Sequence, residues 1–254
     1  MAIKSHKVDS IKPTVNFIIP TYNAGGSLIR CLKSIRNQEE QDWRAIVIDD
    51  ASTDDSLEHA SQFFVADERI ELITNPKNFG ACYSRYRGIH HISQHPEDIC
   101  FLLDGDDWLI GSRALSLVKE AYENGAEATH GSYVTSDGKT PKKGHYSVEV
   151  QKAQSYRSVA WKVQPARTFK YKYFRYLPTS QFREDQDGEW IKACTDLAII
   201  FPVLDQVPFP GFHFIPHTIY RYDNEMRNLK RFGNSYKSRM NSLIRNKSLE
   251  LVRQ

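Results

Sequence analysis

FLLDGDDWL, residues 101–109, is the most informative stretch of this sequence, because an apolar run ends there in three closely spaced aspartates. The longer segment DICFLLD has the length and apolar character of a buried strand. Like charges at this spacing repel one another, so Asp104, Asp106 and Asp107 require a neutralising partner. The stretch therefore predicts a strand whose end carries a charged site.

The same pattern of strand followed by helix repeats around this stretch. Three further apolar segments predict strands, namely VNFIIP, WRAIVIDD and RIELITN. Four segments have helical spacing, namely SLIRCLKSIRNQ, DSLEHASQFF, ACYSRYRGIHHIS and SRALSLVKEAYENG. Strand and helix thus alternate four times with short connections. This predicts the α/β class, with a Rossmann-like, mostly parallel open sheet flanked by helices.

In such a sheet, ligands bind at the carboxyl ends of the strands. The residues at these ends are Thr21–Asn23, Asp49–Asp50 and Asp104–Asp107. A single aspartate at such a turn is often a helix N-cap, but a converging set is better explained by a bound hard cation. The chain has no GxGxxG after its first strand and no Walker A loop. We therefore expect Mg²⁺ or Mn²⁺ held by carboxylates and completed by substrate phosphates.

Charge is segregated along the chain. The net charge is −8 over residues 1–138, +9 over 139–176, −5 over 177–225 and +7 over 226–254, which leaves +3 in total. Eight aromatic and ten basic residues interleave in the second block, a composition that also suits stacking on single-stranded nucleic acid. Nucleic-acid binding is therefore an alternative function, although it does not explain the aspartates.

The last block predicts a basic amphipathic helix. Its apolar side chains share one face: Tyr236, Met240, Leu243, Ile244 and Leu251. Such a helix can lie on an anionic membrane surface, or it can pack on the domain or on a second subunit.

The composition, with 40% hydrophobic and 26% charged residues among 254, is that of a soluble globular protein. We expect no membrane span and no secretory signal, and hence a cytoplasmic location. The four cysteines lie in apolar segments without a CxxC pair and are expected to be reduced core residues. His91 and His95 have the spacing of a zinc pair, but without a third ligand we expect His90, His91 and His95 to be structural.

Four motifs together resemble glycosyltransferase family 2, which has the GT-A fold: IIPTYNAGGSLIRCLKSIRNQ, AIVIDDASTDDS, NFGACYSRYRGI and FLLDGDDWL. The resemblance implies one domain over residues 1–254. Within it, residues 13–138 would bind the nucleotide sugar, residues 139–225 would hold the acceptor and the catalytic base, and residues 226–254 would form the basic tail.

The resemblance also implies roles for individual residues. Tyr22 would stack on the nucleotide base, Asp50 would accept from its amide, and Asp104 would contact the ribose. The nucleotide-binding set is completed by residues in neighbouring turns: Thr21, Asn78 and Arg85. Asp106 and Asp107 would bind the metal. The histidine that often follows the YxY strand of the family is missing here, and Asp223 or Glu225 is expected to replace it as a ligand.

The catalytic base of the family is an acidic residue at the start of a helix, often in the pair ED. The matching place here is CTD, so Asp196 is the expected base, with Thr195 as a departure from the pattern. Competing carboxylates lie just upstream: Glu184, Asp185, Asp187 and Glu189. Arg167 would stabilise the leaving diphosphate, and Trp190 would form part of the acceptor floor or of the core.

These features predict a metal-dependent, inverting glycosyltransferase that moves a sugar from a nucleotide-sugar donor, with a UDP-sugar expected, to a hydroxyl. The acceptor would be a glycan, a lipid-linked sugar or another molecule, and the protein would be cytoplasmic or peripheral at the inner face of the membrane. Two alternatives stay open. One is a nucleic-acid-binding protein, or a transferase with a nucleic-acid acceptor, using residues 139–176. The other is an inactive GT-A binding module.

Overall fold

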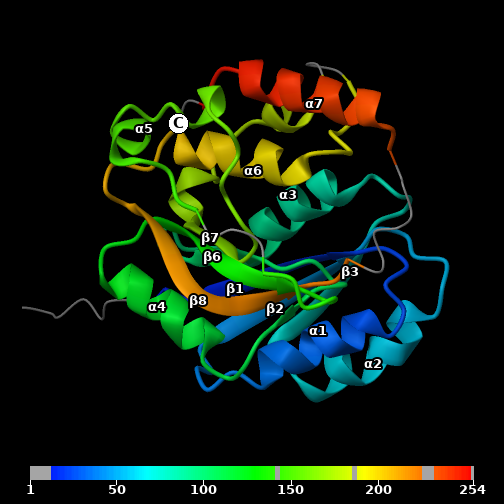
Figure 1. Ribbon diagram of the computed structural model, residues 1–254. Coiled ribbons are helices and arrows are strands. Elements are labelled where there is room, and N and C mark those ends of the chain that lie inside the picture. Colours follow the sequence, from blue (N-terminus) through cyan, green and yellow to red (C-terminus); the bar gives the residue numbers. More distant parts are fainter. Residues whose placement is uncertain (1–12, 141–143, 185–187, 225–231, 253–254) are drawn as a thin grey trace, which may run out of the picture.

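The computed structural model describes residues 13–140, 144–184, 188–224 and 232–252. The first half alternates strand and helix as predicted (Figure 1). Its elements are β1 (Val15–Thr21), α1 (Ser27–Arg36), β2 (Trp43–Asp49), α2 (Ser56–Ala66), β3 (Ile70–Thr74), α3 (Ala81–Ile92) and β4 (Ile99–Leu102). All pairings among these four strands are parallel, so the predicted open sheet is confirmed for this half.

The second half adds strands of both directions. Its elements are β5 (Trp108–Leu109), α4 (Ala114–Glu123), β6 (Ala128–Thr135), α5 (Val148–Lys152), β7 (Arg167–Lys170), α6 (Thr195–Leu204), β8 (Phe212–Tyr222) and α7 (Asn234–Asn246). Three short 3₁₀ helices complete the described part: η1 (Tyr156–Ser158), η2 (Tyr171–Tyr173) and η3 (Thr179–Phe182). The eight strands form one sheet in the order β3-β2-β1-β4-β7-β6-β8-β5. β7 is antiparallel to both β4 and β6, so the sheet is mixed beyond β4.

Helices cover both faces of the sheet (Figure 1). α1, α2 and α4 lie on one face, and α3, α6 and α7 lie on the other. Successive strand residues point to opposite faces, so Phe17 packs with the first group and Ile18 with the second. The predicted stripe of α1 is buried as expected: Leu28, Cys31, Leu32 and Ile35.

α3 lies unusually close to the sheet because of a glycine. A Cβ at Gly88 would come within 2.5 Å of Ile48 Cδ1, so a larger residue would push the helix away from β2. This close approach places Arg85, one turn earlier on α3, in the interior at the end of the strands. Only 4% of Arg85 is exposed.

The second layer on this face is apolar throughout. Residues 197–204 of α6 are all buried, and α7 packs against α6. Met240 and Ile244 of α7 are buried, while Tyr236 and Leu243 are partly buried, as the amphipathic pattern predicts. Leu251 was expected on the same face, but α7 ends at Asn246 and Leu251 is 50% exposed, so that expectation is wrong. No helix in the described ranges is long and apolar enough to cross a membrane.

The cysteines and histidines have structural surroundings. All four cysteines are free thiols; Cys31, Cys82 and Cys100 lie in the core as expected, whereas Cys194 is only half-buried. His90 Nδ1 lies 3.0 Å from the Tyr171 hydroxyl, and His91 Nε2 lies 3.1 Å from a Glu71 carboxylate oxygen. Within the described residues, the three histidines do not gather into a metal-binding group.

Candidate active site

The acidic cluster, defined as Asp104, Asp106 and Asp107, lies in the turn between β4 and β5. One carboxylate oxygen from each residue lies within 4.8 Å of the others. The turn presses against the end of β1: a Cβ at Gly105 would come within 2.9 Å of Thr21 Oγ1. The glycine between the first two aspartates is therefore required by a close approach, which also brings Thr21 beside the cluster.

Asp107 is the buried member of the cluster, with 1% exposed. The Tyr220 hydroxyl donates to Asp107 Oδ2 at 2.6 Å, and the backbone N–H of Asp223 donates to Oδ1 at 2.7 Å. Even so, burial raises the pKa of Asp107 well above its ordinary value, and the charges of Asp104 and Asp106 raise it further. The Asp107 carboxylate is thus held close to two other negative charges, although Asp104 itself is paired with Arg85.

A hard divalent cation fits this donor set. Mg²⁺ and Mn²⁺ prefer carboxylate oxygens, and oxygens this close can share one ion. Asp223 and Glu225 were the two residues expected to supply the third protein ligand of the metal. Asp223 is buried and its Oδ2 is paired with Arg30 Nη2 at 2.7 Å. The Arg30 guanidinium in turn stacks on Trp108 at 3.7 Å from the ring centre. Glu225, the other expected ligand, lies outside the described residues.

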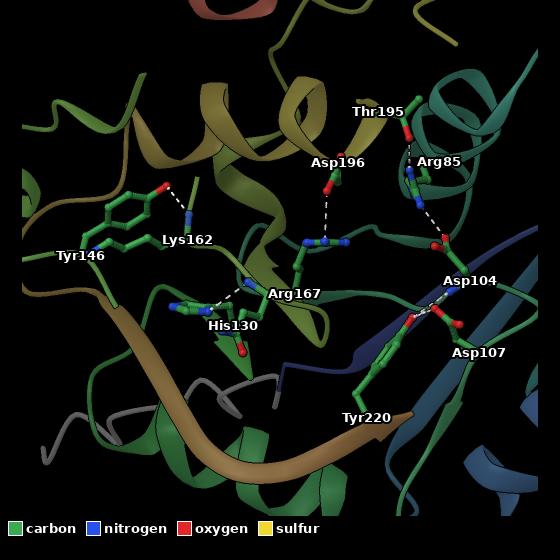
Figure 2. A network of polar contacts seen from close by, with 11 residues as sticks. Arg85, Asp104, Asp107, His130, Tyr146, Lys162, Arg167, Thr195, Asp196 and Tyr220 are labelled. Atoms are coloured by element: carbon green, nitrogen blue, oxygen red, sulfur yellow. Dashed lines mark hydrogen bonds and ion pairs between the residues drawn. The ribbon is translucent and has the colours of Figure 1, made fainter. Parts of the chain in front are cut away.

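Arg85 lies between the acidic cluster and the start of α6, which carries the expected base (Figure 2). Its Nη2 bonds the Asp104 carboxylate, and its Nη1 donates to Thr195 Oγ1 at 2.6 Å. Burial alone would lower the pKa of Arg85, but the Asp104 and Asp196 carboxylates outweigh it and the net pKa is raised. Asp196 follows at the first turn of α6, where Arg167 Nη2 lies 3.1 Å from its Oδ2. The structure therefore brings Asp104, Arg85, Arg167 and Asp196 into one network.

The expected nucleotide side lies at the ends of β1 and β2. Asp50 is 3% exposed and already accepts three hydrogen bonds, from Asn75 Nδ2 at 2.7 Å, Phe79 N at 3.0 Å and Gly80 N at 2.7 Å. These bonds fix the loop that presents Asn78, which is exposed. Tyr22 is half-buried. The contact of Asp50 with a nucleotide base stays a prediction. In the structure, the hydrogen bonds of Asp50 hold this loop in shape.

The remaining candidates are divided between core and surface. Trp190 is 7% exposed and packs edge-on against Tyr83 at 5.0 Å, so most of it belongs to the core. Glu184, a competitor for the role of base, accepts from the Tyr236 hydroxyl and from Arg239 of α7, both at 2.7 Å. Glu189 is exposed. Asp185 and Asp187 lie outside the described residues.

The sequence match agrees with this arrangement. A family model described as "Glycosyl transferase family 2" matches residues 16–190, which include β1 to β4 and the acidic cluster. The chain belongs to glycosyltransferase family 2.

Two family 2 relatives show how far the likeness extends. An uncharacterized glycosyltransferase of Haemophilus influenzae is 31% identical over 125 residues, which cover 49% of this chain and 49% of the relative. The GalNAc(5)-diNAcBac-PP-undecaprenol beta-1,3-glucosyltransferase of Campylobacter jejuni is 30% identical over 132 residues, which cover 51% of this chain and 41% of the relative. The matched stretches span half or less of the length of these two relatives.

Solved structures match over more of the chain. S. aureus TarS 1–349 in complex with UDP-GlcNAc aligns with a TM-score of 0.60 at 15% identity, covering 89% of this chain and 61% of TarS 1–349. The mannosyltransferase PcManGT from Pyrobaculum calidifontis, in complex with GDP-Man and Mn²⁺, gives 0.51 at 18% identity, covering 82% and 56%. At this identity the likeness shows the fold alone, which is GT-A.

Several residues of this family 2 site were missed by the motifs. Tyr220 donates to Asp107, and its hydroxyl oxygen also accepts from Asp104 N at 3.4 Å. The family resemblance placed the end of the IYRY strand near the metal, through Asp223 or Glu225, but it gave Tyr220 itself no role. Thr195 was noted only as a departure from the family pair, and Arg30 only as a helix residue. Their roles depend on contacts between distant segments.

A buried histidine pair was also missed. His130 is fully buried on β6, and its Nε2 lies 2.9 Å from His145 Nδ1. Its Nδ1 is 3.2 Å from the backbone N–H of Gln164, which must donate, so Nε2 carries the proton of a neutral ring. Burial, then the charges of His145 and Arg167, lower the pKa of His130 to about 3. His130, labelled in Figure 2, thereby holds the segment that leads to Arg167 through the backbone N–H of Gln164.

Much of the described part of the basic-aromatic block is buried or paired within the protein. Half of its eight aromatic side chains are buried in the core: Tyr146, Tyr156, Phe169 and Phe174. Several of its cations are paired with carboxylates inside the protein: Lys170 and Lys172 with Glu97 and Glu127, Arg157 with Asp205, and Arg167 with Asp196. This placement weighs against the nucleic-acid alternative.

Proposed function

We propose that this chain is a metal-dependent, inverting glycosyltransferase that transfers a sugar from a nucleotide-sugar donor, a UDP-sugar by preference, to a hydroxyl group. The proposal is carried by one observation. Arg85 links Asp104 of the acidic cluster to Thr195, the neighbour of Asp196, so the proposed donor-binding acid and the proposed base lie at one edge of a GT-A sheet.

The donor would bind across the ends of β1, β2 and β4. Tyr22 would stack on the base, which contributes on the order of 1–3 kcal/mol. Asp104 would accept from the ribose hydroxyls, and Thr21 and the loop around Asn78 would shape the pocket. Asp106 and Asp107 would hold Mn²⁺ or Mg²⁺, which supplies Lewis-acid stabilisation of the leaving diphosphate when bound. Asp223 is a candidate for the remaining position, provided that Arg30 releases it.

Asp196 would act as the general base. It would take the proton of the acceptor hydroxyl as the acceptor oxygen forms a bond to C1 of the sugar and the bond from C1 to the diphosphate oxygen breaks. A single displacement of this kind inverts the configuration at C1. Arg167 holds the Asp196 carboxylate by one hydrogen bond. That contact would orient the base, and the Arg167 cation would offset charge on the departing diphosphate.

The acceptor is proposed by analogy with relatives. The Campylobacter jejuni relative is named for a glycan on an undecaprenol diphosphate. A second relative, WfgD of Escherichia coli, is named as a UDP-Glc:alpha-D-GlcNAc-diphosphoundecaprenol beta-1,3-glucosyltransferase and is 28% identical over 119 residues. We therefore propose a lipid-linked or other glycan acceptor. Because the apolar face of α7 packs on α6, contact with a membrane surface would rely on the basic side chains of that helix.

The test is slow hydrolysis of nucleotide sugars with Mn²⁺, after a thermal-shift screen of nucleotide sugars has identified the donor. Asp196→Asn should lower turnover by about 10²–10⁴-fold, because the base is lost, while affinity for uridine diphosphate stays within about twofold. Glu189→Gln, at an exposed competitor, should leave turnover unchanged. Turnover that survives in Asp196→Asn, or in excess chelator, would contradict the proposed mechanism. Binding without any turnover would favour the inactive-module alternative.

A further inference from the structure

Arg85 touches both sides of the proposed active site at once. Its guanidinium bonds the Asp104 carboxylate through Nη2 and donates to Thr195 Oγ1 from Nη1 at 2.6 Å. Because Arg85 is 4% exposed, water competes for these contacts far less than at a surface pair. Figure 2 shows the guanidinium of Arg85, which is on α3, between Asp104 at the end of β4 and Thr195 at the start of α6.

The start of α6 is fixed by side chains from other elements. Its N-cap residue, Cys194, has a φ of 56° and makes no side-chain capping hydrogen bond. The first turn is instead held from two directions, by Arg85 at Thr195 and by Arg167 at Asp196. Without these contacts, the position of the first turn would depend on the apolar packing further along the helix.

We propose that Arg85 is a positioning residue that sets the place of Asp196 relative to the donor-binding acids, and that it acts through the Thr195 hydroxyl. This inference rests on the proposed function, in which Asp196 takes the acceptor proton. The Thr195 hydroxyl is a neutral acceptor for Arg85. The buried guanidinium can therefore join the acidic cluster to the start of α6 without a second carboxylate next to Asp196. A displacement of a catalytic group by about 1 Å can lower turnover on the order of 100-fold.

Thr195→Val tests the contact because it removes the hydroxyl, keeps the shape and leaves Asp104 and Asp196 in place. We expect kcat for hydrolysis of the donor to fall about tenfold, while KM and the affinity for uridine diphosphate with Mn²⁺ stay within about twofold. Thr195→Ser keeps the hydroxyl and should restore most of the turnover. Thr179→Val, at an exposed threonine that begins η3, is the matched control. If Thr195→Val does not fold, Thr195→Ala carries the same test.

The outcomes separate this inference from the function on which it rests. Wild-type turnover in Thr195→Val would overturn the positioning role and leave the proposed function standing. Equal losses of kcat and of affinity for uridine diphosphate would also overturn it, because they would indicate general damage to the site. A wild-type chain that binds uridine diphosphate but hydrolyses no nucleotide sugar would overturn the proposed function, and this inference with it.

Discussion

The acidic cluster and the basic block at residues 144–176 are both conspicuous in the sequence, and the fold treats them in opposite ways. The block places its cations against carboxylates of other segments: Lys170 and Lys172 against Glu97 and Glu127, Arg157 against Asp205. The cluster gathers three carboxylates within 4.8 Å and buries one of them. The charges of the block are therefore paired across distant segments, whereas those of the cluster are gathered in one turn, where Asp104 and Asp106 raise the pKa of Asp107.

The strongest test of this contrast removes one charge from the cluster. Asp106→Asn should lower Mn²⁺-dependent turnover by about 10³-fold, or about 4 kcal/mol, because a metal ligand is lost. In excess chelator, the same substitution should raise the melting temperature, because one of three repelling charges is gone. Asp137→Asn, at an exposed aspartate, is the control for both measurements. A metal-free variant that melts below the wild type would contradict the idea that the Asp106 charge repels the buried Asp107 carboxylate.

The opposite sign of effect is expected in the basic block. Arg157 Nη2 lies 2.7 Å from Asp205, and burial raises the pKa of that carboxyl while Arg157 lowers it. Arg157→Met should lower the free energy of unfolding by about 2 kcal/mol, because it leaves the half-buried Asp205 carboxylate without its charged partner. Chemical denaturation measures this directly. Lys152→Met, which removes an exposed cation of the same block, should change stability little. Equal effects of the two substitutions would show that Arg157 is a surface charge.

A third test uses pH and the buried pair that supports the block. The pKa of His130 is about 3 in the folded chain, against 6.5 as its ordinary value. Between these two pH values, His130 is protonated in the unfolded chain but not in the folded chain. The free energy of unfolding therefore falls as the pH drops from about 6.5 toward 3, and at pH 5 the loss is about 2 kcal/mol. His130→Asn should be less stable at pH 8 but should lose less on acidification. His217→Asn, at an exposed histidine, should keep the wild-type pH dependence.

The smallest expected effect concerns the aromatic residues of the block. Tyr176 is half-buried and stacks with Arg175 at 4.5 Å, so it is the kind of side chain that a bound base would use. If single strands stacked here, Tyr176→Leu would weaken binding by about 1–3 kcal/mol. We expect less than a twofold change in the affinity for a single-stranded RNA in filter binding. A larger loss, together with a steep salt dependence, would revive the nucleic-acid hypothesis.

Local sequence patterns were sufficient for the first half of the fold. In β1 to β4, apolar runs of four to seven residues alternate with helices whose buried stripes follow the helical period, so elements and order could both be predicted. The second half could not be predicted in the same way. β7 enters antiparallel between β4 and β6, and its four residues lie inside a stretch without clear periodicity. Such a strand is defined by its neighbours in space.

The site shows the same division. The aspartates after β4 could be identified because a strand end and three acids coincide in one short stretch. The bonds that hold them come from residues with no comparable signal. Asp50 was expected to contact the nucleotide, which stays a prediction; that its oxygens also accept from Asn75 and from the backbone of Phe79 and Gly80 is revealed only by the folded loop.

β8 has a consequence for the order in which the protein matures on the ribosome. The hydroxyl of Tyr220 and the N–H of Asp223 reach Asp107 from 113 and 116 positions further along the chain. A nascent chain that ends before β8 would already contain the acidic cluster. Its Asp107 carboxylate would, however, lack both of these donors. The two donors that hold the Asp107 carboxylate are thus acquired late in synthesis, when β8 docks.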